Sequence, residues 1–92
     1  MEWRLFATLA EAADARSVRL DLDPDATVGD ALDALVADAP AVEERLYDAD
    51  GDIYDHVRVL HNGADPFATG DGLAEPVAAD DELALMPAVS GG

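Results

Sequence analysis

The residues that could do chemistry in this sequence lie at its C-terminal end. The last seven residues read MPAVSGG, so an apolar stretch runs into Pro87 and is followed by a tail ending in Gly91 and Gly92. Proline cannot donate to a strand ladder, and two residues without a Cβ can pass through a narrow channel. A terminal glycine also leaves its carboxyl carbon open to a nucleophile. The pattern indicates that the working group is the α-carboxylate of Gly92.

Two aspartate-rich stretches have the alternate spacing of a calcium loop, DLDPDAT and DADGD. An EF-hand loop needs glycine at position six and a glutamate at position twelve. The first stretch has Ala26 and Leu32 at these positions, and the second has Val59 at position twelve. Because neither stretch supplies the closing carboxylate, we expect no metal site.

His56 and His61 are the only histidines, and no nucleophile or metal-ligand arrangement accompanies them. The absence of cysteine excludes disulfides, thiolate zinc sites, iron–sulfur clusters and a cysteine nucleophile. The glycines of ATGDG do not lead from a strand into a helix, so they do not predict a phosphate loop. We therefore interpret both histidines as surface or strand-edge residues. The sequence predicts a protein that is not an enzyme and holds no cofactor.

The charge of the chain is strongly one-sided. It has 21 acidic and five basic residues, all five of them arginine, for a formal charge of −16. Such a surface repels phosphate backbones and anionic lipid, which disfavours nucleic-acid and membrane binding. The acidic residues are spread along the whole chain, a pattern typical of proteins that stay soluble in a very salty cytoplasm, where repulsion is screened.

The length of 92 residues predicts one small domain with an aliphatic core. No stretch approaches the roughly 18 apolar residues of a membrane helix. The N-terminus also lacks the basic start and apolar run of a signal peptide. We expect a soluble, cytoplasmic protein.

Four segments alternate between apolar and polar residues, as strands do. In 57–63 the dipeptide Asn62-Gly63, favoured in hairpin turns, closes the strand. The first two segments are joined by a connection short enough for antiparallel pairing. The four predicted strands are residues 2–8, 17–22, 57–63 and 82–87.

The period changes between the second and third strands. In TVGDALDALVADAP an apolar stripe has the spacing of one helix face, and it consists of Val28, Ala31, Leu32, Leu35 and Val36. Thr27 is a suitable N-cap, with Asp30 completing a variant of the capping box. Pro40 stops this helix and begins a short second one that carries Val42 and Leu46.

Two loops complete the predicted organisation. Residues 47–56 have a tight turn at Asp50-Gly51, and 64–81 is irregular with a short edge strand. The sum is an α+β fold, in which one main helix packs on one face of a mixed four- to five-stranded sheet. We expect a domain at 1–87 and a flexible tail at 88–92.

The order of these elements, the TVGDALDALV helix and the DDELALMPAVSGG ending resemble the ubiquitin-like β-grasp family over essentially the whole chain. The most similar branches are the small subunit of molybdopterin synthase and the small ubiquitin-like modifiers of haloarchaea. The resemblance implies a carrier. A ubiquitin-activating-type enzyme uses ATP to adenylate the terminal glycine. The acyl adenylate then becomes a thiocarboxylate that donates sulfur, or is transferred to a lysine of a target protein as an isopeptide.

The same resemblance implies that the first, third and last strands lie side by side. Alternation places six apolar residues toward the helix: Trp3, Leu5, Val57, Val59, Leu83 and Leu85. Phe6, Leu60 and Met86 then share the opposite, solvent-facing side. Isolated exposed apolar residues are ordinary, but three on neighbouring strands predict a docking patch for the activating enzyme or the larger synthase subunit. Pro87, Val89 and Ser90 complete the predicted partner-binding residues.

Three functions stay open at this stage. The first is a protein modifier, with or without sulfur carriage, and the second is a dedicated sulfur carrier for molybdopterin synthase. The third is a non-covalent β-grasp interaction domain. If the chain is a modifier, its lack of lysine leaves only the α-amine of Met1 to accept a second copy.

Overall fold

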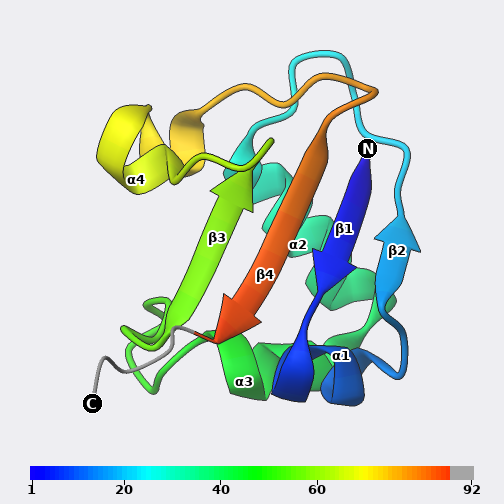
Figure 1. Cartoon of the computed structure of the whole chain (residues 1–92), viewed down its shortest axis with the longest axis vertical. Helices are drawn as coiled ribbons and strands as arrows, with labels where there is room; N and C mark the ends of the chain where they lie inside the picture. The colour runs from blue at the N-terminus through cyan, green and yellow to red at the C-terminus, as the bar shows by residue number, and fades with distance from the viewer. Residues whose placement is uncertain (88–92) are drawn as a thin grey trace.

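The computed structural model describes residues 1–87 (Figure 1). Four strands and four α-helices alternate along this part of the chain, together with two short 3-10 helices at Pro40–Val42 and Gly72–Ala74. In chain order they are β1 (Glu2–Leu5), α1 (Ala7–Ala13), β2 (Ser17–Arg19), α2 (Val28–Asp38), α3 (Glu43–Leu46), β3 (Val57–His61), α4 (Pro66–Thr69) and β4 (Glu82–Pro87).

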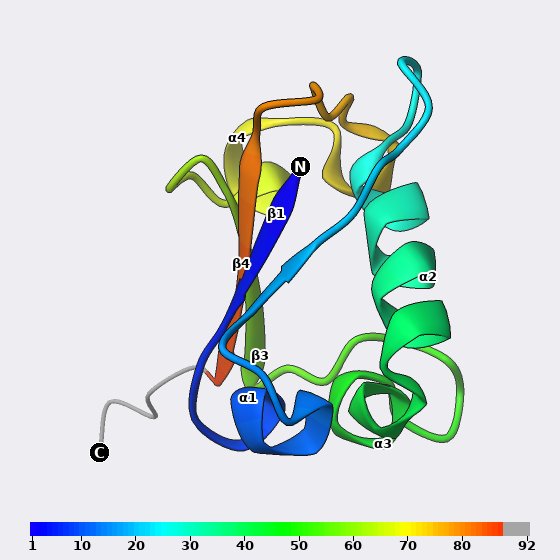
Figure 2. The same ribbon diagram turned by 90° about the vertical axis from the view of Figure 1, so that its right-hand side faces the viewer.

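The strands form one mixed sheet in the order β2-β1-β4-β3. β1 pairs antiparallel with β2 and parallel with β4, and β4 pairs antiparallel with β3. Helices α2 and α3 lie on one side of this sheet (Figure 2). The expected α+β fold, with the first, last and third strands adjacent, is therefore confirmed.

The main helix begins and ends as its sequence indicates. The Thr27 side chain accepts from the Asp30 amide, and the Asp30 carboxylate accepts from the Thr27 amide, so the predicted capping box is present. Pro40 starts a 3-10 turn that leads into α3, where Leu46 is fully buried. Both predicted helices are therefore confirmed.

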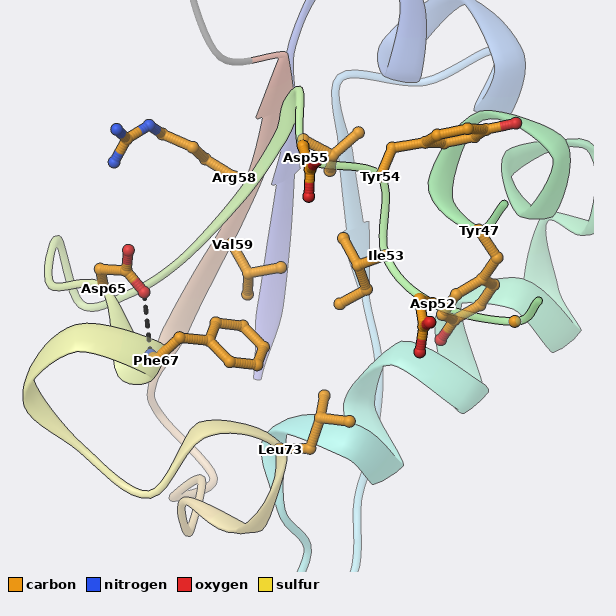
Figure 3. Close-up of a pocket in the computed structure, with 12 residues that line it drawn as sticks. Tyr47, Asp52, Ile53, Tyr54, Asp55, Arg58, Val59, Asp65, Phe67 and Leu73 are labelled. Atoms are coloured by element: carbon orange, nitrogen blue, oxygen red, sulfur yellow. Dashed lines mark hydrogen bonds between the residues drawn. The ribbon is translucent and has the colours of Figure 1, made fainter. Parts of the chain in front are cut away.

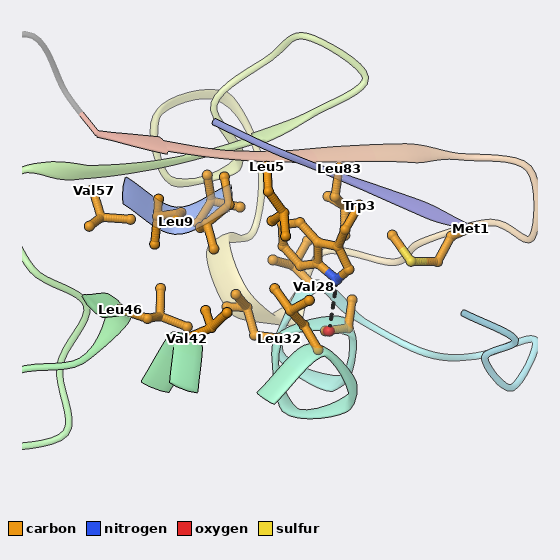
Figure 4. Packing of buried hydrophobic residues seen from close by; sticks show 14 of the residues in the cluster. Met1, Trp3, Leu5, Leu9, Val28, Leu32, Val42, Leu46, Val57 and Leu83 are labelled. Carbon is orange, nitrogen blue, oxygen red and sulfur yellow. Dashed lines mark hydrogen bonds between the residues drawn. The ribbon is translucent and has the colours of Figure 1, made fainter. Parts of the chain in front are cut away.

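The core lies between the sheet and α2 (Figure 4). All six side chains assigned to the helix-facing side are buried, and Trp3 has no exposed surface. Its indole Nε1 donates to the backbone carbonyl of Ala31, 3.0 Å away, which satisfies the one polar atom of this ring inside the core. The alternation of apolar residues was sufficient to assign this face.

The first strand is shorter than predicted. It ends at Leu5 instead of residue 8, and the supposed connection contains helix α1. The segment ATLAEAA is rich in alanine, the best helix former, and its Leu9 is buried against the core. A positive φ of 51° at Ala7 separates strand from helix. Local helix propensity and the burial of Leu9 together override the alternating pattern.

The other boundaries were wrong by less. β2 ends at Arg19, although the amide of Leu20 still bonds to the carbonyl of Met1. Asn62 and Gly63 both have positive φ, as a tight hairpin turn requires, and His61 forms a bridge with Ala64 across them. The short edge strand predicted within 64–81 is absent from the described structure, which has α4 and a 3-10 helix there.

Candidate functional site

Strand β4 is the element that leads to the proposed reactive group. It occupies the middle of the sheet between β1 and β3, with Leu83 and Leu85 fully buried. Pro87 is its last residue and lies opposite Val57 of β3. A centrally paired strand cannot shift without breaking two ladders. The direction in which the chain leaves the sheet is therefore fixed up to Pro87.

Four predicted site residues lie outside the described residues: Val89, Ser90, Gly91 and Gly92. The proposed flexible tail at 88–92 lies there too.

The solvent-facing side of the sheet carries the predicted apolar patch, which is Phe6, Leu60 and Met86. Leu60 and Met86 are half-buried diagonal neighbours across the β3–β4 ladder, since Leu60 pairs with Ala84, two residues before Met86. Phe6 follows β1 as the N-cap of α1, 45% exposed, and its amide donates to the carbonyl of Leu85. This bond holds the backbone of Phe6 against β4, one residue from Met86.

Two arginines share this side with the patch. Arg58 lies directly opposite Met86, and the Nε of Arg4 is 3.2 Å from a carboxylate oxygen of Glu82. Guanidinium groups can bind a carboxylate-bearing partner, while the apolar side chains bury surface. Strand alternation puts Arg4 on the same side as Phe6 and Arg58 on the same side as Leu60, but the predicted partner-binding residues did not include these arginines. Their strand parity was the signal that could have added them to the site.

A polar network holds the other end of β4. His61 of β3 lies between two carboxylates: its Nδ1 contacts Glu75, and its Nε2 is 2.7 Å from Asp81. Asn62 Nδ2 donates to the second oxygen of Asp81, and the Glu82 amide donates to Asn62 Oδ1. The network ties the long 64–81 loop to the strands on both sides of it. We call His61, Asn62, Glu75 and Asp81 the loop clamp.

The clamp shifts the pKa of two of its members. Burial lowers the pKa of His61, but hydrogen bonds and charge from Asp81 and Glu75 outweigh it, so the net pKa is raised. The pKa of Asp81 falls to about 2, because its carboxylate accepts from the Ala78 amide, Asn62 and His61. Both shifts favour the charged pair near neutral pH.

The outcome for the two histidines is mixed. His61 does lie on an edge strand, but it is not a surface residue, since only 13% of its side chain is exposed. Its acidic partners are 14 and 20 residues away in the sequence, so no local spacing could reveal them. His56 is exposed and stacks on Tyr54.

Metal and membrane motifs are likewise missing from the part of the chain that is described. Within residues 1–87 no group of three or more His, Asp or Glu side chains has an arrangement that could hold a metal ion. None of the helices found there is long and apolar enough to cross a membrane.

Comparison with known proteins places the chain in a family. The model of the ThiS family matches residues 3–92. The chain therefore belongs to the ThiS family of small ubiquitin-like proteins, whose members are carriers or modifiers and not catalysts.

Within this family the chain is most usefully compared with proteins of Haloferax volcanii. It is 59% identical to small archaeal modifier protein 1 over all of both chains. It is 38% identical to small archaeal modifier protein 3, over all of this chain and 98% of the relative. The crystal structure of the first superposes with a TM-score of 0.86, covering 99% of this chain and 97% of the other. These likenesses confirm the β-grasp fold.

Proposed function

We propose that this chain is a ubiquitin-like protein modifier that acts through the carboxyl group of Gly92. The similarity to small archaeal modifier protein 1, unbroken over both chains, is the observation that carries this proposal. The central position of β4 supports it, because a rigid domain can then present the residues after Pro87 to a partner's active site. The work takes place in the cytoplasm.

The chemistry begins with activation. A bare carboxylate resists nucleophilic attack, so a ubiquitin-activating-type enzyme first uses ATP. The Gly92 carboxylate attacks the α-phosphorus, pyrophosphate leaves, and an acyl adenylate forms. The ε-amine of a lysine on a target protein then attacks the acyl carbon, AMP leaves with the bonding pair, and an isopeptide bond joins the two proteins. The carrier binds no cofactor itself.

The patch gives the activating enzyme a surface to recognise. Phe6, Leu60 and Met86 present apolar area on one side of the sheet, beside Arg4 and Arg58. Pro87, Val89 and Ser90, which precede Gly92 in the sequence, complete the proposed partner-binding residues. In so acidic a protein, like-charge repulsion rejects wrong partners more than attraction selects the right one.

Family membership supports a second function, which is sulfur carriage. In this route the acyl adenylate is converted to a thiocarboxylate, with a sulfur atom replacing an oxygen of the Gly92 carboxylate. The carrier then donates sulfur, as the small subunit of molybdopterin synthase does with its large subunit. Both routes share the activation step, so one protein can serve both.

Deletion of Gly91 and Gly92 tests the proposal. The shortened chain should keep its fold, because residues 1–87 contain the four-stranded sheet and the core cluster, and it should lose all conjugates and all thiocarboxylate in cells. Mass spectrometry of lysine-linked remnants and of the intact free protein measures both products. Ala49→Gly, at an exposed position of the turn between α3 and β3, is the control. If the shortened chain retained its cellular functions, the chain would be a non-covalent interaction domain instead.

A further inference from the structure

A hollow of about 500 Å³ lies beside β3, on the same side of the sheet as α2. The segment 47–59 forms one wall, and α4 with the following 3-10 helix forms the other. Figure 3 shows Ile53, Val59, Phe67 and Leu73 directed toward the same space. The floor of the hollow is therefore apolar, although it opens on an acidic protein surface.

Two apolar side chains that line the hollow are largely exposed to solvent. Phe67 is 52% exposed and Leu73 is 47% exposed. Within residues 1–87 the one other large hydrophobic side chain exposed to this degree is Phe6, which belongs to the patch. A single exposed apolar residue needs no explanation, but two that line one hollow indicate a contact surface.

The backbone beside the hollow is an unpaired strand edge. β3 is one of the two edge strands of the sheet. The amide of Asn62 donates to the carbonyl of Glu82 in β4, and in an antiparallel ladder the backbone groups of alternate residues point the same way, so those of Leu60 and Arg58 also point toward β4. The amide and carbonyl of Val59 therefore point away from β4, and within residues 1–87 no backbone bond outside the strand ladders involves them. An added strand could pair here.

The charge at the rim specifies the occupant. Asp52, Asp55 and Asp65 line the hollow, and the formal charge of the whole chain is −16. Arg58 is the basic residue of this lining, and in Figure 3 its guanidinium points away from the apolar floor. An acidic segment would be repelled, whereas lysine or arginine side chains would meet carboxylates.

We propose that this hollow and the outer edge of β3 form a non-covalent docking site for an extended, basic segment of a partner protein. The segment adds to the sheet as a fifth strand and bonds to the backbone of Val59. Apolar side chains on one face of the segment fill the space between Phe67 and Leu73. Lysine or arginine side chains near its ends reach Asp52 and Asp55. The site does not use the Gly92 carboxyl group, so it does not depend on the modifier function.

A synthetic peptide provides the probe. In acetyl-Lys-Thr-Val-Thr-Ile-Thr-Lys-amide, one face of the extended chain carries Lys, Val, Ile and Lys. An NMR titration of the full chain, at the lowest salt that preserves the folded amide spectrum, should give saturable shifts at Val59, Ile53, Phe67 and Leu73. A peptide with glutamate in place of lysine should bind roughly tenfold more weakly or less well still. N-methylation of two adjacent central residues should abolish binding, because it removes backbone donors.

Variants of the protein locate the site. The double substitution Phe67→Ser and Leu73→Ser should weaken binding roughly tenfold, since it removes apolar area from the contact. Asp52→Asn with Asp55→Asn should weaken it about threefold at low salt and less at high salt. Phe6→Ser, at an equally exposed phenylalanine on the other side of the sheet, is the matched control and should leave the affinity unchanged.

Three results would overturn the proposal. The first is an absence of saturable shifts at Val59, and the second is equal binding of the basic and acidic peptides. The third is a loss of binding in Phe6→Ser, which would place the peptide on the patch. A dilution series without peptide separates one further occupant: shifts of Val59 that depend on protein concentration would assign the edge to a second copy of this chain. If the Phe67 and Leu73 variant fails to fold, the aspartate variants and the N-methylated peptide still test whether the segment binds at this site.

Discussion

Strand β4 begins in a polar network and ends beside an apolar patch, and the two ends differ in how they are built. At its beginning the loop clamp ties the 64–81 loop to β3 with charged hydrogen bonds that are mostly shielded from solvent. At its end Phe6, Leu60 and Met86 leave apolar area on the sheet surface. The first arrangement joins its polar groups within the chain and contributes stability. The second leaves apolar area that binding could remove from water, as the proposed contact with an activating enzyme requires.

The largest expected effect tests the patch end. Phe6→Asp with Met86→Asp should lower kcat/KM for adenylation by about 10- to 100-fold, because buried apolar contact with the activating enzyme becomes charged. The free energy of unfolding should change little, since Phe6 is 45% exposed and Met86 is on the solvent side. Pyrophosphate exchange measures the activation. Phe67→Asp, at an exposed phenylalanine of α4, is the control. Unchanged activation in the double variant would show that the patch is not the enzyme's contact.

An intermediate effect is expected from the clamp end. His61→Ala leaves Glu75 and Asp81 partly buried without their cation, and it should lower the free energy of unfolding by about 2 kcal/mol. Activation at saturating folded protein should remain normal, in contrast to the patch variant. Denaturant unfolding measures the loss. His56→Ala, at the exposed histidine of the same chain, should cost no more than about 0.5 kcal/mol. Equal losses of stability in both variants would show that the loop clamp does not stabilise the fold.

The smallest expected effect is a dependence of the free energy of unfolding on pH, caused by His61 of the loop clamp. The pKa of His61 is raised on folding, so its contribution is complete below its unfolded value near 6.5 and is lost as pH rises through the folded value. The free energy of unfolding should therefore be lower at pH 9 than at pH 6. In His61→Gln this difference should shrink, which separates His61 from other groups that titrate in the same range. If the unsubstituted protein and His61→Gln showed the same pH dependence, the dependence would come from groups other than His61.

Asp81 acts with the opposite sign at low pH. Its pKa falls from 3.8 to about 2 on folding, so its contribution is present above pH 4 and is lost as the pH drops through about 2. Together the two shifts make the clamp strongest in mildly acidic solution. Acid unfolding of Asp81→Asn, compared with Asp80→Asn beside it, isolates this effect. Asp80 is exposed and serves as the matched neighbour.

The sequence predicted correctly those features that a local pattern of residues determines. The alternation of Trp3 and Leu5, and of Leu83 and Leu85, placed the buried side of the sheet correctly. Thr27 and Asp30 fixed the start of α2 through a local hydrogen-bond pair. These signals depend on neighbours within a few residues, so one sequence contains them in full.

The failures share a different physical cause. Helix α1 was missed: its first two residues were predicted as the end of a strand and the rest as a connection, because the burial of Leu9 by tertiary packing leaves no trace in the local alternation. The His61 contacts with Glu75 and Asp81 depend on how the 64–81 loop folds back. The hollow beside β3 likewise joins Ile53, Phe67 and Leu73 from three separate segments. Long-range convergence of this kind leaves no pattern in the order of residues.

The parallel pairing of β1 with β4 has a consequence for how the molecule is made. Residues 2–5 cannot join β3 in one sheet until residues 82–85 have been synthesised, because β4 lies between β1 and β3. A ribosome that stalls before residue 82 therefore releases a chain whose sheet cannot close and whose apolar strands remain open to chaperones and proteases. The topology thus makes completion of the sheet depend on the synthesis of residues 82–85.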